Sequence, residues 1–140
     1  MKSPTNKDEA ASFFLEWLIE DGYSSTLRAW GSLLRDGPIG KPTSTELSLH
    51  EWFRALGPKE QSKVLKLVEE VVNLTLFSSL VVFDAALWEG DKRHKLALHL
   101  EIQDPEGQSI IDSFRINPEG EDELHDLYNV MMDKLRKNQK

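Results

Sequence analysis

Apolar residues recur at helical spacing in the first quarter of the chain. Within residues 1–37 they form two runs separated by Gly22, which is a natural helix end. Ser24 or Ser25 can cap the second run, which ends near Gly37. The pattern therefore predicts an N-terminal helical hairpin.

The middle of the chain predicts a loop, a short helix and a long helix. Residues 38–47 are rich in Gly and Pro, which break regular structure. Ser48 and Glu51 match a capping box, which begins a short helix. A long helix follows over Pro58–Phe83, with apolar residues on all sides from Val71 onward. A helix of that kind is buried, so we expect its second half at the centre of the fold. Its β-branched residues leave strand open for residues 76–83, but helix is favoured.

A β-hairpin is expected next. Residues 94–103 alternate between apolar and polar, and the turn sequence Asp104-Pro105-Glu106-Gly107 follows. A three-residue loop with Gly107 as a bulge unites the apolar residues better than a two-residue loop does. The register so predicted pairs Ile102 with Ile110, Leu100 with Asp112, Leu98 with Phe114, and Leu96 with Ile116.

The remaining elements complete the predicted domain. A third strand is left open for residues 84–90, and Asn117 and Pro118 are typical of the cap and first residue of a last helix. An isolated hairpin is marginally stable, so its apolar face should cover the long helix. We expect one helix-rich α+β domain over residues 1–140, in which residues 48–140 supply the long helix, the hairpin and the last helix.

Composition excludes several classes of protein. The 140 residues include no Cys, which excludes a disulfide scaffold, a thiolate zinc site and a cysteine nucleophile. The net charge of -7 argues against a nucleic-acid binder. Residues 104–140, with 5 basic and 9 acidic residues, are the most acidic part. The polar N-terminus and the interrupted apolar region at residues 71–88 predict a cytoplasmic protein without a membrane partner.

No catalytic motif is present, and the four histidines have no ligand-like spacing. We therefore expect no cofactor and no metal. Two acids are candidates for a functional cleft. Asp112 falls on the apolar face of the hairpin, where it either blocks edge-to-edge pairing or serves as a functional acid. Asp84 follows the long helix, where it either caps the next turn or serves the same cleft.

The densest acidic cluster lies at the expected start of the last helix. First-turn acids favour the helix dipole, but the cluster also suits docking of a cationic partner. Its members are Glu119, Glu121, Asp122, Glu123 and Asp126.

Three of the four tryptophans, Trp17, Trp30 and Trp52, fall on apolar helix faces and are expected in the core. Trp88 stands in a polar turn region and is a candidate interface anchor, because tryptophan is enriched in binding hot spots.

Three segments carry a resemblance that covers residues 56–129. They are Leu-Gly-Pro-Lys-Glu-Gln at the start of the long helix, Val-Val-Phe-Asp at its end, and Leu-His-Asp-Leu-Tyr-Asn after the hairpin. In these the chain resembles small uncharacterised bacterial α+β proteins, some of which are toxin-neutralising immunity factors. The resemblance implies no catalytic motif and transfers no functional residue.

Three hypotheses for function follow. The leading one is a non-enzymatic protein-binding protein, such as an inhibitor, immunity factor or small accessory subunit, that uses an acidic surface. The second is a small enzyme with a cleft containing Asp84, Asp112 and His99. The third is a homo-oligomeric structural module that associates through the N-terminal aromatic helices.

Overall fold

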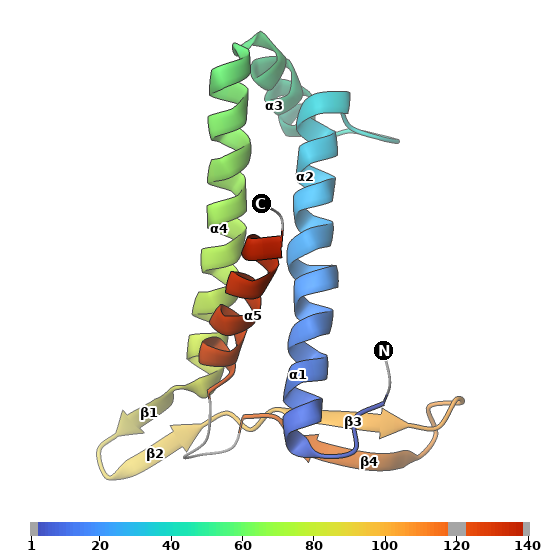
Figure 1. Ribbon diagram of the computed structural model, residues 1–140, viewed down its shortest axis with the longest axis vertical. Coiled ribbons are helices and arrows are strands. Elements are labelled where there is room, and N and C mark those ends of the chain that lie inside the picture. The colour runs from blue at the N-terminus through green and yellow to red at the C-terminus, as the bar shows by residue number, and fades with distance from the viewer. Residues whose placement is uncertain (1–2, 118–122, 139–140) are drawn as a thin grey trace. The chain divides into compact units, whose positions relative to one another are not determined.

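The computed structural model describes residues 3–117 and 123–138 and has the predicted α+β class (Figure 1). The chain divides into two compact units, one formed by residues up to 19 and from 76 onward, the other by residues 20–75. The elements in order are α1 (Lys7–Trp17), the π-helix η1 (Leu18–Ser24), α2 (Ser25–Asp36), α3 (Ser44–Ala55), α4 (Pro58–Asp84), β1 (Ala86–Glu89), β2 (Lys92–Lys95), β3 (His99–Gln103), β4 (Ile110–Arg115) and α5 (Leu124–Asn138).

Helical backbone continues through Gly22, so the predicted helix end at this glycine is wrong. A glycine that ends a helix takes a positive φ, and Gly22 is not among the residues that do so. The π-helical η1 instead joins α1 to α2 without a loop, and the hairpin predicted for residues 1–37 lacks its turn. Gly37 does end α2, as predicted, with a φ of 98°.

The short helix α3 begins at Ser44, which is earlier than predicted, and it shortens the predicted loop at residues 38–47. The capping box is formed by Thr43 and Glu46, because the Thr43 hydroxyl accepts from the Glu46 amide at 3.2 Å and the Glu46 carboxylate accepts from the Thr43 amide at 2.7 Å. Ser48 and Glu51 fit the same sequence pattern but lie inside the helix. The capping box at Thr43 is the one that forms, because it starts the helix directly after Pro42 and so adds helical hydrogen bonds that a start at Ser48 would lack.

This capping box lowers the pKa of Glu46 below its ordinary value, chiefly through the Thr43 amide and then through the Thr43 hydroxyl. Thr43→Ala removes the hydroxyl but keeps the backbone amide, which is the larger cause, so we expect the pKa of Glu46 to return part of the way. The check is an NMR titration of the side-chain carboxyl carbon. Because the folded pKa is the lower one, the carboxylate stabilises the fold above its unfolded pKa, and this contribution is lost as pH falls through the folded pKa. Ser48→Ala is the matched control. An equal change in both variants would contradict the observed cap.

Within residues 20–75, α2 and α3 pack together around Leu34 and Phe53, which are both buried. A ring nitrogen of His50, Nδ1, lies 3.0 Å from the carbonyl oxygen of Leu34 near the end of α2. The Gln61 side chain donates to the carbonyl oxygens of Phe53 and Leu56, which lie at the end of α3. Polar side chains thus satisfy backbone groups that the helix ends leave unpaired.

The long helix α4 begins at Pro58, as predicted, and residues 76–83 are helical. The expectation that its second half is buried on all sides is wrong. Leu80 is 1% exposed, but Val82 is 61% exposed. One face of this part of the helix is therefore buried, and the apolar residues on the opposite face are exposed to solvent. No helix in the described parts of the chain is long and apolar enough to cross a membrane.

The strands form two separate antiparallel hairpins, β1–β2 and β3–β4 (Figure 1). The third strand left open for residues 84–90 exists as β1, but it pairs with β2 in a sheet of its own. Residues 94–103 are consequently not one strand, because β2 ends at Lys95 and β3 begins at His99.

The predicted register of the second hairpin is wrong by two residues. Leu100 pairs with Phe114, and Ile102 pairs with Asp112, with an irregularity between Ile102 and Gln103. The loop is wider than predicted, since the Asp104 amide donates to the Ser109 carbonyl at 3.0 Å and the Asp104 carboxylate accepts from the Gln108 amide at 2.8 Å. A shift of two residues keeps every side chain on its predicted face, so the alternation did not distinguish the two registers. Gly107 has the expected positive φ, at 69°.

The unit that contains both hairpins has a core of α1, α4 and α5 residues: Ala10, Leu15, Leu80, Leu124, Tyr128 and Met132. The last helix begins at Leu124, and Asn117 is not its cap. Asn117 is buried and joins three backbone groups. Its side chain donates to the carbonyl oxygens of Phe83 and Leu96, at 2.9 and 3.0 Å, and accepts from the Leu98 amide at 2.8 Å. Pro118 lies outside the described residues.

Candidate ionisable site at the start of the last helix

A buried carboxylate at the end of α4 holds the start of α5. Oxygen Oδ2 of Asp84 accepts from the His125 amide and lies 3.0 Å from Nδ1 of the same residue. The side chains of Asp84 and His125 are 3% and 18% exposed. The expectation that Asp84 caps the turn that follows it is wrong, because it caps a helix 41 residues further along the chain. That position suits a negative charge, since the N-terminal end of a helix carries partial positive charge.

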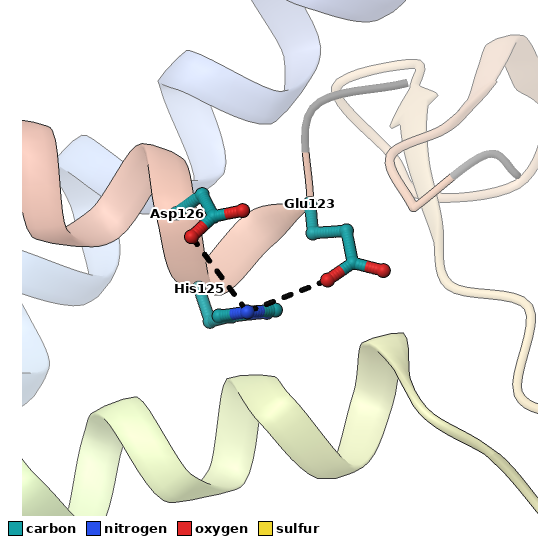
Figure 2. Close-up of side chains that lie close together, drawn as sticks. All are labelled: Glu123, His125 and Asp126. Carbon is teal, nitrogen blue, oxygen red and sulfur yellow. Dashed lines mark ion pairs between the residues drawn. The ribbon is translucent and has the colours of Figure 1, made fainter. Parts of the chain in front are cut away.

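Two further acids approach the other nitrogen of the same imidazole (Figure 2). Nε2 of His125 lies 3.4 Å from Glu123 and 3.7 Å from Asp126. The Phe77 ring, on α4, meets the imidazole edge-on, with the ring centroids 5.6 Å apart. The imidazole is therefore fixed by α4 on one side and faces two carboxylates on the other.

This geometry defines what the cluster can do chemically. A carboxylate that holds one ring nitrogen fixes the tautomer and leaves the other nitrogen to bind a proton or a metal ion. The candidate ligand atoms of Glu123, His125 and Asp126 lie within 4.8 Å of one another, so they are the residues that could hold a cation. Exposed acidic groups gather in this way in many proteins without an ion. Asp84 would then be an orienting residue and not a ligand.

Sequence reasoning named three of the four residues in this cluster, Asp84, Glu123 and Asp126, but did not connect them. It missed His125 because it searched for histidines spaced from one another. A usable signal was the sequence Glu-Leu-His-Asp at residues 123–126, which places one imidazole among acids in a first helical turn. Glu119, Glu121 and Asp122 lie outside the described residues.

The other acid expected in a cleft is not part of this site. Asp112 is exposed on β4, and its carboxylate accepts from the adjacent Ser113 amide at 2.8 Å. His99 lies on β3, where Nδ1 is 3.4 Å from the Ser113 hydroxyl oxygen. Asp84, in contrast, is buried against α5. The structure therefore does not bring the predicted cleft residues together.

The β1–β2 hairpin presents a second candidate site, which is apolar and basic. Leu87 and Trp88 are 73% and 68% exposed, and the Arg93 guanidinium lies 5.9 Å from the Trp88 ring centroid. Beside the hairpin is a groove of about 610 Å³, lined by Val82, Ala85, Leu87, Arg93, His94, Lys95 and Leu96. Residues 92–95 form β2. The expectation that Trp17, Trp30 and Trp52 are core residues is wrong, because each is between 40% and 49% exposed.

No family model matches this chain, and no curated protein or solved structure is significantly similar to it.

Proposed function

We propose that this protein is a non-enzymatic protein-binding protein that contacts its partner through the β1–β2 hairpin. The observation that carries the proposal is the exposure of Leu87 and Trp88, two adjacent large apolar residues on one short strand. Consecutive residues of a strand face opposite sides of the sheet, so each face of this hairpin presents one large apolar side chain to solvent. Such side chains are costly to leave in water, and exposed apolar surface of this kind is typical of protein interfaces. Tryptophan is also among the residues that contribute most to binding energy in interfaces.

The hairpin supports this proposal better than the acidic cluster does. Glu123 and Asp126 both lie beside Nε2 of His125, so these two acids already have a partner within the chain. By contrast, Leu87 and Trp88 lie in a two-stranded sheet, where little apolar surface covers them. The partner class proposed from the sequence, an enzyme or toxin that this protein inhibits or assists, is retained.

Site-specific photo-crosslinking in the cells that produce the protein tests this function. A photoreactive amino acid at position 87 should yield one discrete crosslinked protein, and the additional change Trp88→Ala should reduce its yield several-fold. The matched control is the same photoreactive residue at position 101, an exposed site on the other hairpin. A toxin in the crosslinked product would identify an immunity function, and an enzyme subunit would identify an accessory role.

Two outcomes of this experiment contradict the proposal. Equal crosslinking from positions 87 and 101 would mean that the hairpin is not a specific contact surface. A crosslink between two copies of the chain would support the homo-oligomeric module instead.

A further inference from the structure

We infer that Glu123, His125 and Asp126 bind a zinc ion at the start of α5. This inference goes beyond the proposed function, because it concerns other residues and another kind of ligand. It also differs from the sequence-based expectation of no metal, which considered the spacing of histidines from one another and not a single histidine among acids. All the residues that carry it belong to the unit formed by residues up to 19 and from 76 onward.

The separations between the ligand atoms match those around a metal ion better than those of hydrogen bonds. Nε2 of His125 lies 3.4 Å from Oε2 of Glu123 and 3.7 Å from Oδ1 of Asp126 (Figure 2). An imidazole N–H group that donated to a carboxylate would bring these atoms to about 2.7–2.9 Å. Two ligands of one tetrahedral zinc ion, each bound at about 2.0–2.2 Å, are instead about 3.4 Å apart. The three ligand atoms all lie within 4.8 Å of one another, so small side-chain movements would place them around one ion.

A buried carboxylate already holds the imidazole in the orientation that a metal ligand needs. Nδ1 of His125 lies 3.0 Å from Oδ2 of Asp84, whose side chain is 3% exposed. A histidine that binds a metal ion almost always uses its other ring nitrogen in this way, which fixes the ring and leaves Nε2 for the ion. The Phe77 ring meets the same imidazole edge-on. These contacts distinguish the site from an ordinary group of exposed acids, because its central ligand is held in place before an ion binds.

The charge of the site favours a cation in spite of its position in the fold. The N-terminal end of a helix carries partial positive charge, which by itself disfavours a cation. Three carboxylates, those of Asp84, Glu123 and Asp126, surround the imidazole. Within residues 3–117 and 123–138, no lysine or arginine forms an ion pair with any of the three. A divalent ion would therefore meet more negative charge from these side chains than positive charge from the helix end.

The mixture of ligand atoms selects zinc over calcium and magnesium. Calcium and magnesium take oxygen ligands, whereas zinc binds imidazole nitrogen and carboxylate oxygen together. Three protein ligands leave the fourth tetrahedral position to water or to a group of another molecule. The three residues lie in the first turn of α5 or directly before it, and His125 is also held by α4. A bound ion would therefore stabilise the start of α5.

The test is isothermal titration calorimetry of the full chain with zinc chloride, after treatment with a chelator that is then removed. We expect one zinc ion per chain with a dissociation constant of about 10 µM or below, and binding of magnesium at least about ten-fold weaker. The double change Glu123→Gln and Asp126→Asn keeps the size of both side chains and should weaken zinc binding at least about ten-fold. Asp84→Asn, which acts through His125 as a positioning residue, should weaken it about ten-fold.

His94→Ala is the matched control and should leave zinc binding unchanged. Nε2 of His94 also lies beside a carboxylate, that of Glu89, at 3.5 Å. Circular dichroism establishes that each variant is folded, so that a loss of binding is not a loss of the fold. Three results would overturn the inference: no binding of zinc by the wild type, equal weakening by His94→Ala, or unchanged binding by the Glu123→Gln and Asp126→Asn double variant. Magnesium binding as tight as zinc binding would also overturn it, because it would indicate a general attraction of cations to acidic residues. A specific crosslink from position 87 would still support the proposed function in each of these cases.

Discussion

Replacing Asn117 by alanine is expected to lower the free energy of unfolding by about 3 kcal/mol, the largest effect we predict for a single polar side chain. The substitution removes two donors and one acceptor and leaves the Phe83 and Leu96 carbonyl oxygens and the Leu98 amide without this partner. A buried backbone group that loses its partner costs about 1 to 3 kcal/mol. These three groups are only partly buried, so water offsets some of that cost.

The measurement is urea unfolding of the wild type and each variant, followed by circular dichroism. Asn117→Asp keeps the size of the side chain but places carboxylate oxygens against two carbonyl oxygens, so it should destabilise at least as much as alanine does. Asn129→Ala, at an exposed position on α5, is the matched control and should change the free energy of unfolding by about 0.5 kcal/mol or less. A similar loss for Asn129→Ala and Asn117→Ala would contradict the role assigned to Asn117.

Features governed by local rules could be predicted from the sequence. The start of α4 at Pro58 follows from the fixed φ of proline, and the end of α2 at Gly37 follows from the conformational freedom of glycine. The positive φ of Gly107 follows in the same way from its turn. Each of these depends on a few neighbouring residues, so no knowledge of tertiary structure is needed.

Features that depend on distant residues could not be predicted. Asn117 has the sequence of a helix cap, but its side chain binds backbone groups 19 to 34 residues away. A one-dimensional pattern cannot distinguish these roles, because asparagine satisfies backbone groups equally well in both. The β3–β4 register was ambiguous for a related reason: two registers that differ by two residues place the same side chains on the same face.

The candidate site shows the same limitation. Asp84 was identified as an unusual acid at a helix end, but its partner, His125, lies on another helix. The β1–β2 hairpin was only partly anticipated, through Trp88 and the third strand left open. The pairing of β1 with residues 92–95 could not be predicted, because each of the two strands has only four residues. A strand of that length is too short to show a clear alternation of apolar and polar residues.

Replacing Asp84 by alanine is the second large effect we expect, a loss of about 2 kcal/mol in the free energy of unfolding. The substitution removes the acceptor for the His125 amide at the start of α5, and the loss of a capping side chain costs about 1 kcal/mol. It also removes the buried partner of the imidazole. Breaking a buried ion pair costs about 3 to 5 kcal/mol when a charge is left behind. The cost here should be smaller, because the imidazole is not fully buried, with 18% of its side chain exposed.

A double-mutant cycle with His125→Ala separates the two contributions of Asp84. The His125 amide remains in that variant, so the cap survives and only the interaction between side chains is lost. We therefore expect His125→Ala alone to destabilise less than Asp84→Ala, with a coupling energy of about 1 kcal/mol between the two changes. Asp84→Asn keeps an oxygen that can accept from the His125 amide, so it should destabilise less than Asp84→Ala. Strict additivity in the cycle would mean that Asp84 acts on α5 through the backbone amide alone, and that the imidazole is not held by this carboxylate.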